Sequence, residues 1–185
     1  MGRKRHIFVQ VSDPILRSKA WEGFTQAMGE DPDVVMTRVR SPKQATDQVL
    51  EACKKILHGS YCVYLQWHLH RGNVDFGQVI SLGTCRDSHN LARFVYSGFN
   101  SMILGEGVAQ KFHSHYNEEE VERHPGMSDL TDLHKASGGK CVPVVFRPMA
   151  ERNPKAGENF NDAGRMSIMG ILLGRQCINY IKRSA

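Results

Sequence analysis

One apolar stretch near the middle of the chain constrains the fold more than any other. Residues 61–70 read Tyr-Cys-Val-Tyr-Leu-Gln-Trp-His-Leu-His. Aromatic and β-branched residues fill this run, and an apolar run of this length is typical of a strand buried on both faces. It ends in His68 and His70, and Arg71-Gly72-Asn73 follows as a turn. Open α/β sheets build their sites at the carboxyl ends of strands, which makes His68 a candidate site residue.

The rest of the chain alternates between strand-like and helix-like segments. Buried strands are predicted at residues 7–11, 34–38, 75–83 and 141–146, and helices at 15–29, 42–57, 88–99 and 162–181, with a further helical piece over 102–115. This spacing indicates βαβ units. We therefore predict one α/β domain over residues 1–185: a three-layer, mostly parallel (mixed) sheet with helices on both faces and residues 61–68 at or near its centre. The long loops 116–128 and 147–161 are predicted to be functional, the second bordering the same cleft as His68.

Composition narrows the class of protein. The chain has 185 residues, of which 41% are hydrophobic and 23% charged, ordinary values for a globular domain with a real core. No apolar run approaches the roughly 18 residues of a membrane span, and no secretory signal is visible, so a cytoplasmic protein is expected. The five cysteines are scattered without a Cys-x-x-Cys pair, which favours reduced thiols over a disulfide framework or zinc knuckle. The net charge of +5 leaves nucleic acid open as a partner.

The order of elements resembles the zinc-dependent N-acetylmuramoyl-L-alanine amidases, which cleave peptidoglycan stem peptides. The segment Val34-Val-Met-Thr-Arg38 is similar to a family strand ending in Thr-Arg, and Leu65-Gln-Trp-His68 to the strand that carries a zinc-binding His. Leu130 to Asn153 is similar to the family's penultimate segment with its Pro-Val-Val strand, and the final helix ending in Tyr180-Ile181 also fits. The resemblance implies an amidase-like α/β fold, zinc as cofactor and a peptidoglycan-like polymer as substrate.

The family's metal residues are matched unevenly. His68 is carried over directly as the zinc-binding His. The family has another His after its first strand, where this sequence has Asp13, and a Glu near the start of its first helix, where the nearest acid is Glu22. Because zinc also accepts carboxylate oxygens, Asp13, Glu22 and His68 form a candidate metal set. Glu151, on the loop after the Pro-Val-Val strand, is the candidate base for a metal-activated water.

A second interpretation uses thiol chemistry. His68 lies at the end of one predicted strand, and Cys85 lies just past the end of the next, in Val79-Ile-Ser-Leu-Gly-Thr-Cys85. Cysteine peptidases of the caspase-like fold place a His and a Cys at adjacent strand ends in that chain order, and this segment resembles their nucleophile strand. In such a dyad the imidazole holds the thiolate. Cys85 is therefore an alternative nucleophile, with His68 as its partner.

A third interpretation is non-catalytic. The family's general-base Glu follows the Pro-Val-Val strand, where this sequence has Arg147, a reversal of charge. A hydrolase fold whose ligands have changed can persist as a scaffold or binding module, because function depends on the site rather than the fold. Arg38, Arg71 and Arg147 would then form an anion-binding face for nucleic acid phosphates or for another protein in an assembly.

Overall fold

The computed structural model describes residues 4–56, 60–69, 78–83, 85–100, 113–116, 127–148 and 162–183. The strands in these ranges are β1 (Arg5–Val11), β2 (Val34–Val39), β3 (Cys62–Trp67), β4 (Gln78–Leu82), β5 (His113–Tyr116) and β6 (Cys141–Arg147). The helices are α1 (Asp13–Leu16), α2 (Lys19–Gly29), α3 (Pro42–Lys55), α4 (Arg86–Asn100), α6 (Met127–Ala136) and α8 (Ala163–Arg183). None of these helices is both long enough and apolar enough to cross a bilayer.

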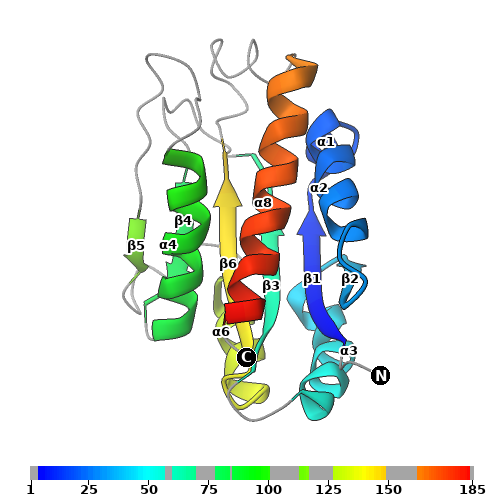
Figure 1. The fold of residues 1–185 in the computed structure, drawn as a ribbon. Helices are drawn as coiled ribbons and strands as arrows, with labels where there is room; N and C mark the ends of the chain where they lie inside the picture. Colours follow the sequence, from blue (N-terminus) through cyan, green and yellow to red (C-terminus); the bar gives the residue numbers. More distant parts are fainter. Residues whose placement is uncertain are drawn as a thin grey trace.

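The strands form one six-stranded sheet in the order β2-β1-β3-β6-β4-β5 (Figure 1). Neighbours from β2 to β6 run parallel, whereas β4 runs antiparallel to β6 and parallel to β5. The sheet is therefore mixed and mostly parallel, as predicted. All six residues of β3 are buried, and β3 has a parallel strand on each side. This confirms the prediction that the apolar run lies near the centre of the sheet.

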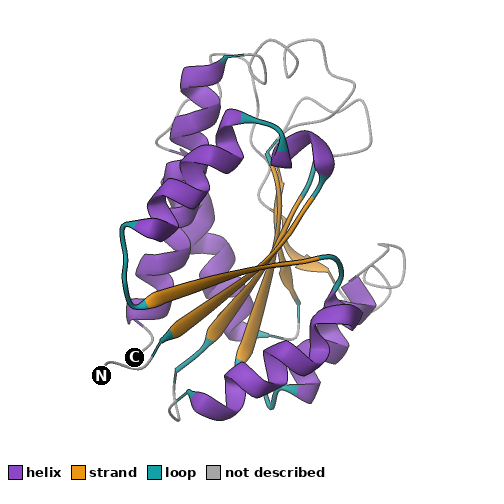
Figure 2. Ribbon diagram, turned by 90° about the vertical axis from the view of Figure 1, so that its right-hand side faces the viewer, coloured by secondary structure: helices purple, strands orange, loops and turns teal. Residues whose placement is uncertain are grey.

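Helices cover both faces of the sheet, which confirms the three-layer architecture (Figure 2). One face packs against α1, α2, α4 and α8, and we call it the α2/α8 face. The other packs against α3 and α6, and we call it the α3/α6 face. Both α3 and α6 lie toward the amino ends of the parallel strands (Figure 1). Among the described helices, those of this face therefore cover its amino end.

The α2/α8 face is packed closely through glycines. A Cβ on Gly170 of α8 would lie 1.8 Å from the carbonyl oxygen of Ala20 on α2, and a Cβ on Gly23 would lie 2.2 Å from the carbonyl oxygen of Ser167. Only glycine allows two helix backbones to approach this closely, because a side chain at either position would overlap backbone atoms. The contact fixes α8 across α2 and over the central strands.

Three local predictions differ from the structure. The helix predicted over 15–29 is broken after Leu16, where the Ser18 hydroxyl donates to the Ile15 carbonyl at 2.7 Å and ends α1. The helical piece predicted over 102–115 is wrong at its described end, because residues 113–116 form β5 beside β4. The predicted elements also lack α6, although Met127, Leu130 and Leu133 recur at helical spacing and are buried.

Candidate functional site

The α3/α6 face carries polar side chains at the carboxyl ends of the parallel strands. Phe8, Tyr64 and Val145 belong to the core of this face. Because side chains alternate between the two faces along a strand, Gln10, Gln66 and Arg147, two positions further on, lie on the same face. The antiparallel β4 begins at the same end, where Gln78 is the register partner of Arg147. We call this set the polar row: Gln10, Tyr64, Gln66, His68, Gln78 and Arg147.

A hydrogen bond joins two members of the polar row that come from neighbouring strands. The Nε–H of Arg147 donates to Nε2 of His68 at 2.8 Å. The His68 backbone N–H donates to the Phe146 carbonyl at 3.1 Å, which extends the β3–β6 ladder and fixes both side chains at one level. A guanidinium has no acceptor, so Nε2 of His68 accepts and the neutral ring carries its proton on Nδ1. The lone pair of Nε2 is therefore directed at a guanidinium.

A second network holds the row between β1 and β3. The side-chain oxygen of Gln10 accepts from the Tyr64 hydroxyl and from the Gln66 amide, each at 3.1 Å. Burial raises the pKa of Tyr64, so its hydroxyl keeps its proton and remains a donor. One acceptor thus fixes two donors, and this part of the row is preorganised by the fold.

Three buried polar atoms at this end of the sheet lack a hydrogen-bond partner in the described structure: Gln78 Oε1, Trp67 Nε1 and Ser12 Oγ. Gln78 is 7% exposed and lies on the α3/α6 face opposite Arg147. Trp67 is fully buried on the α2/α8 face, where it packs against Phe24. Buried polar atoms are nearly always hydrogen-bonded in folded proteins. The Gln78 oxygen, on the strand beside Arg147, can therefore accept a hydrogen bond from water or from a ligand.

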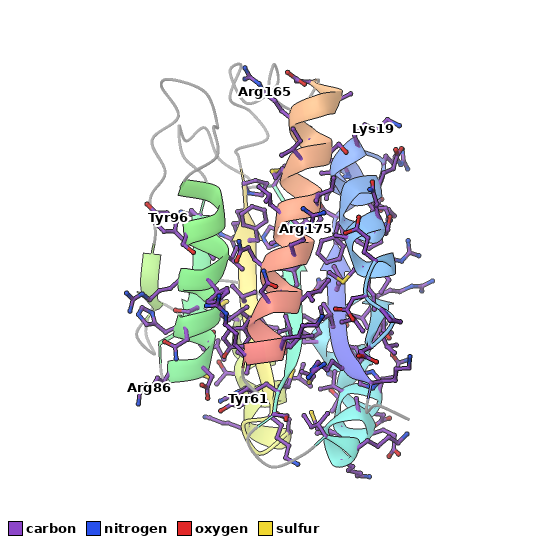
Figure 3. The ribbon with its side chains drawn as sticks, in the orientation of Figure 1. Lys19, Tyr61, Arg86, Tyr96, Arg165 and Arg175 are labelled. Carbon is purple, nitrogen blue, oxygen red and sulfur yellow. The ribbon has the colours of Figure 1, made fainter. Side chains whose placement is uncertain are left out.

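The structure does not bring together the predicted metal set. Asp13 is the exposed first residue of α1, and Glu22 is exposed on α2, where it forms an ion pair with Lys19 at 2.6 Å. Figure 3 shows Lys19 on the outer side of α2, away from the sheet. His68 lies on the opposite face. Within the described ranges, no three His, Cys, Asp or Glu side chains are placed to hold a metal ion. These residues do not fit a zinc ion, and Glu151 lies outside the described residues.

The predicted His68–Cys85 dyad is not formed either. β6 lies between β3 and β4, and β4 runs in the reverse direction, so Cys85 follows the end of the sheet opposite His68. Arg86 and Tyr61, which mark that end, lie at the bottom of Figure 3. Cys85 Sγ instead lies 3.9 Å from Nδ1 of His134, and the same nitrogen bonds the Cys141 carbonyl at 2.7 Å.

The predicted anion-binding face is only partly described. Arg38 is exposed on the edge strand β2, three strand spacings or roughly 14 Å from β6. Arg71 lies outside the described residues, as does the loop 147–161 beyond Pro148. Of the three arginines, the structure thus places only Arg147 in the polar row.

The glutamines of the polar row are not among the predicted site residues, although the sequence carries a signal for them. Gln10 and Gln66 each interrupt an apolar strand, and they are register partners on β1 and β3. A buried amide in such a strand needs a partner on a neighbouring strand. Two glutamines near the ends of two predicted strands could therefore have indicated a shared polar site.

Comparison with known proteins gives evidence at the level of the fold. No family model and no curated protein sequence matches this chain significantly. The structure is similar to the CwlD amidase from Clostridioides difficile, solved in complex with the GerS lipoprotein, with a TM-score of 0.62, 9% identity and coverage of 97% of this chain and 100% of that chain. It is also similar to the N-acetylmuramyl-L-alanine amidase Ami1 from Mycobacterium smegmatis, with a TM-score of 0.60, 9% identity and coverage of 98% of each chain.

A third solved structure has a different activity. The uridine phosphorylase from Vibrio fischeri ES114 aligns with a TM-score of 0.54, 8% identity and coverage of 97% of this chain and 92% of that chain. The chain therefore has an amidase-like fold, as the sequence resemblance implied. Because a phosphorylase also aligns along most of its length, the fold alone does not specify the function.

Proposed function

We propose that this chain is a metal-independent binding module on an amidase-like fold, in which Arg147 and His68 recognise an anionic group. The 2.8 Å hydrogen bond between these two residues carries the proposal. In the amidase family that the sequence resembles, the position of His68 holds a zinc-binding His, and the position of Arg147 holds the general-base Glu. Zinc would sit about 2.0–2.1 Å from an imidazole nitrogen. A permanent cation bonded to that nitrogen opposes a metal there and supplies a positive charge of its own.

The chemistry of the polar row defines the class of ligand. A guanidinium presents five N–H donors in a planar fork that suits carboxylate and phosphate groups. His68 is a neutral acceptor, so it orients the guanidinium without neutralising its charge. The unpaired oxygen of Gln78 requires a donor. The ligand is therefore an oxyanion that also carries an N–H or O–H group.

The sequence left three kinds of partner open, and the first two meet this description. A peptidoglycan-like polymer carries carboxylates close to amide N–H groups, and the amidase-like fold supports this choice. A protein assembly offers acidic side chains beside backbone amides. The fold neighbour CwlD was solved with a protein partner, which supports this second source. Nucleic acid phosphates are the third candidate, on the basis of the net charge of +5.

A hydrolytic function is the second candidate, because the amidases share the fold. It would require Arg147 to leave His68 and metal ligands to come from residues outside the described ranges. Elemental analysis of the purified protein separates the two functions. We expect no stoichiometric zinc; zinc that is bound by the wild type and lost in His68→Ala would contradict the binding module and favour the hydrolase.

Binding to a small probe tests the proposal directly. We expect N-acetylglycine, which combines a carboxylate with an amide N–H, to bind the full chain in calorimetric or NMR titration. Arg147→Ala should weaken binding by about 10–100-fold, because a hydrogen bond to a charged group contributes about 1.5–3 kcal/mol. Arg38→Ala removes the same charge from the distant edge strand and serves as the matched control. An equal loss in both variants would mean that net charge, rather than the polar row, attracts the probe.

A further inference from the structure

Cysteines that are scattered in the sequence gather in the fold. Four of the five lie in the core of the α3/α6 face: Cys53, Cys62, Cys85 and Cys141. The fifth, Cys177, is alone on the α2/α8 face. All five are free thiols, and all are buried. The group lies toward the amino ends of the parallel strands, away from the polar row, so it can be considered independently of the proposed binding function.

Two of these thiols are already in contact. Cys53 Sγ and Cys62 Sγ are 3.4 Å apart, whereas the sulfurs of a disulfide are about 2.05 Å apart, so a closure of roughly 1.4 Å would join them. Cys62 is the first residue of β3 and is fixed by the sheet. Cys53 lies in the last turn of α3, and helix ends fray. The required movement can therefore take place at a helix end without disturbing the sheet.

We propose that Cys53 and Cys62 form a thiol–disulfide exchange site whose substrate is a small disulfide of the glutathione type. The Cys53 thiolate attacks one sulfur of the small disulfide, forms a mixed disulfide and releases one small thiolate. The Cys62 thiolate then attacks the Cys53 sulfur, closes the intrachain bond and releases the second. The two protons of the protein thiols end on the two released thiolates. The protein is oxidised by two electrons, and the small disulfide is reduced.

The surroundings assign the order of attack. In the packed structure both thiols are buried, Cys53 with 4% of its surface exposed and Cys62 with none. Cys53 lies in the last turn of α3 and Cys62 is fixed in β3, so fraying of the helix end exposes Cys53 first. Lys140, whose ammonium donates to the Cys53 carbonyl at 3.2 Å, places a positive charge near that thiol. The contact with Cys62, followed by burial, raises the pKa of Cys53, and the contact with Cys141 is the largest cause raising the pKa of Cys62. The thiolate is the nucleophile, and these raised pKa values keep both thiols protonated in the packed core. The reaction therefore requires the last turn of α3 to fray, and mildly alkaline solution favours ionisation of the exposed Cys53.

Cys141 is the alternative disulfide partner of Cys62, so the proposed Cys53–Cys62 bond can be tested against a Cys62–Cys141 bond. It is the register partner of Cys62 on β6, and its thiol also contacts Cys62. Each is the first residue of its strand and the two are directly paired in the β3–β6 ladder, so closure would have to deform the sheet there. Cys53 can move instead, which is why the geometry favours Cys53–Cys62 over Cys62–Cys141.

The experiment incubates the folded full chain with oxidised glutathione at pH 8.5, quenches with acid, and maps thiols and disulfides by mass spectrometry. We expect the wild type to lose two thiols, with Cys53 linked to Cys62, and dithiothreitol to restore them. Cys141→Ala and the matched control Cys177→Ala should form the same bond. Cys53→Ala should form no intrachain bond. A Cys62–Cys141 bond in Cys53→Ala would overturn the proposal, as would a folded wild type that keeps all five thiols while the urea-unfolded chain reacts.

Discussion

The two faces of the sheet are built for different purposes. The α2/α8 face is apolar along its length, and its helices approach through glycines until backbone nearly touches backbone. The α3/α6 face is covered by α3 and α6 toward one end, carries thiols there, and has polar side chains at the other end. A close-packed face holds the fold with little tolerance for change. The other face can therefore carry polar side chains and altered site residues while the amidase-like fold persists.

The largest effect should come from Gly170→Ala, which tests whether the α2/α8 face holds the fold. The new Cβ would lie 1.8 Å from a backbone oxygen of α2, so one helix must shift. We expect a loss of about 3 kcal/mol or more in the free energy of unfolding, at the upper end of overpacking costs. Gly29→Ala is the matched control, because its Cβ meets nothing within 4 Å. Similar losses in urea denaturation of both variants would refute the claim of close packing.

Gln10→Leu tests whether the polar row is held by its own hydrogen bonds. The substitution leaves the Tyr64 hydroxyl and the Gln66 amide without their shared acceptor. An unsatisfied buried donor costs about 1–3 kcal/mol, so we expect a loss of about 2 kcal/mol. Gln26→Leu changes an exposed glutamine of α2 and should alter stability by less than about 0.5 kcal/mol. A loss no larger than that of the control would show that the row does not depend on Gln10.

Gln78→Met should raise the stability of the fold, whereas Gln10→Leu should lower it. It removes a buried oxygen that has no hydrogen-bond partner, in a side chain of similar shape. We expect the free energy of unfolding without ligand to rise by about 1 kcal/mol, while binding of N-acetylglycine weakens. Gln66→Met is the contrasting variant, since the amide of Gln66 has a partner and its loss should destabilise. A drop in stability for Gln78→Met would mean that this residue is structural.

The smallest effect concerns pH and His134, on the thiol side of the α3/α6 face. The contact with Cys85, more than the bond to the Cys141 carbonyl, raises the pKa of His134 above its usual value, although burial opposes the shift. The folded state therefore holds this proton more tightly than the unfolded state. Its contribution to stability is complete below about pH 6.5 and is lost as the pH rises through the folded value. Unfolding curves from pH 5.5 to 8.5 should show the advantage of wild type over His134→Gln shrinking with rising pH; a constant difference would contradict this.

The sequence predicted the layers well and the contacts poorly, for physical reasons. The apolar runs at 61–68 and 141–146 identify buried strands because burial alone selects their residues. Periodicity contains no information about strand direction, so the reversal of β4 and the separation of Cys85 from His68 could not be seen. Glu22 was a different kind of error. Ala20, Phe24 and Ala27 define the buried side of α2, and Glu22 falls outside it.

The bond between His68 and Arg147 depends on register. Each residue was singled out from the sequence, one as a metal ligand and the other as an anion binder. Their meeting follows from the pairing of Trp67 with Phe146, which places the next residue of each strand side by side. A register shift of one residue would turn either side chain to the other face. Sequence patterns identify strands, but the alignment of two strands far apart in the chain is set only when they pack.

The position of β6 has a consequence for synthesis. Among the described strands β6 is the last in chain order, yet it lies between β3 and β4 in the middle of the sheet. While the chain grows on the ribosome, β2-β1-β3 and β4-β5 can exist only as two fragments, each with an open edge where β6 will bind. Open edges invite pairing with other chains, and contacts between distant segments form slowly. Nascent chains that end before β6 should therefore depend on chaperones, and slower translation before β6 should lower the yield of folded protein.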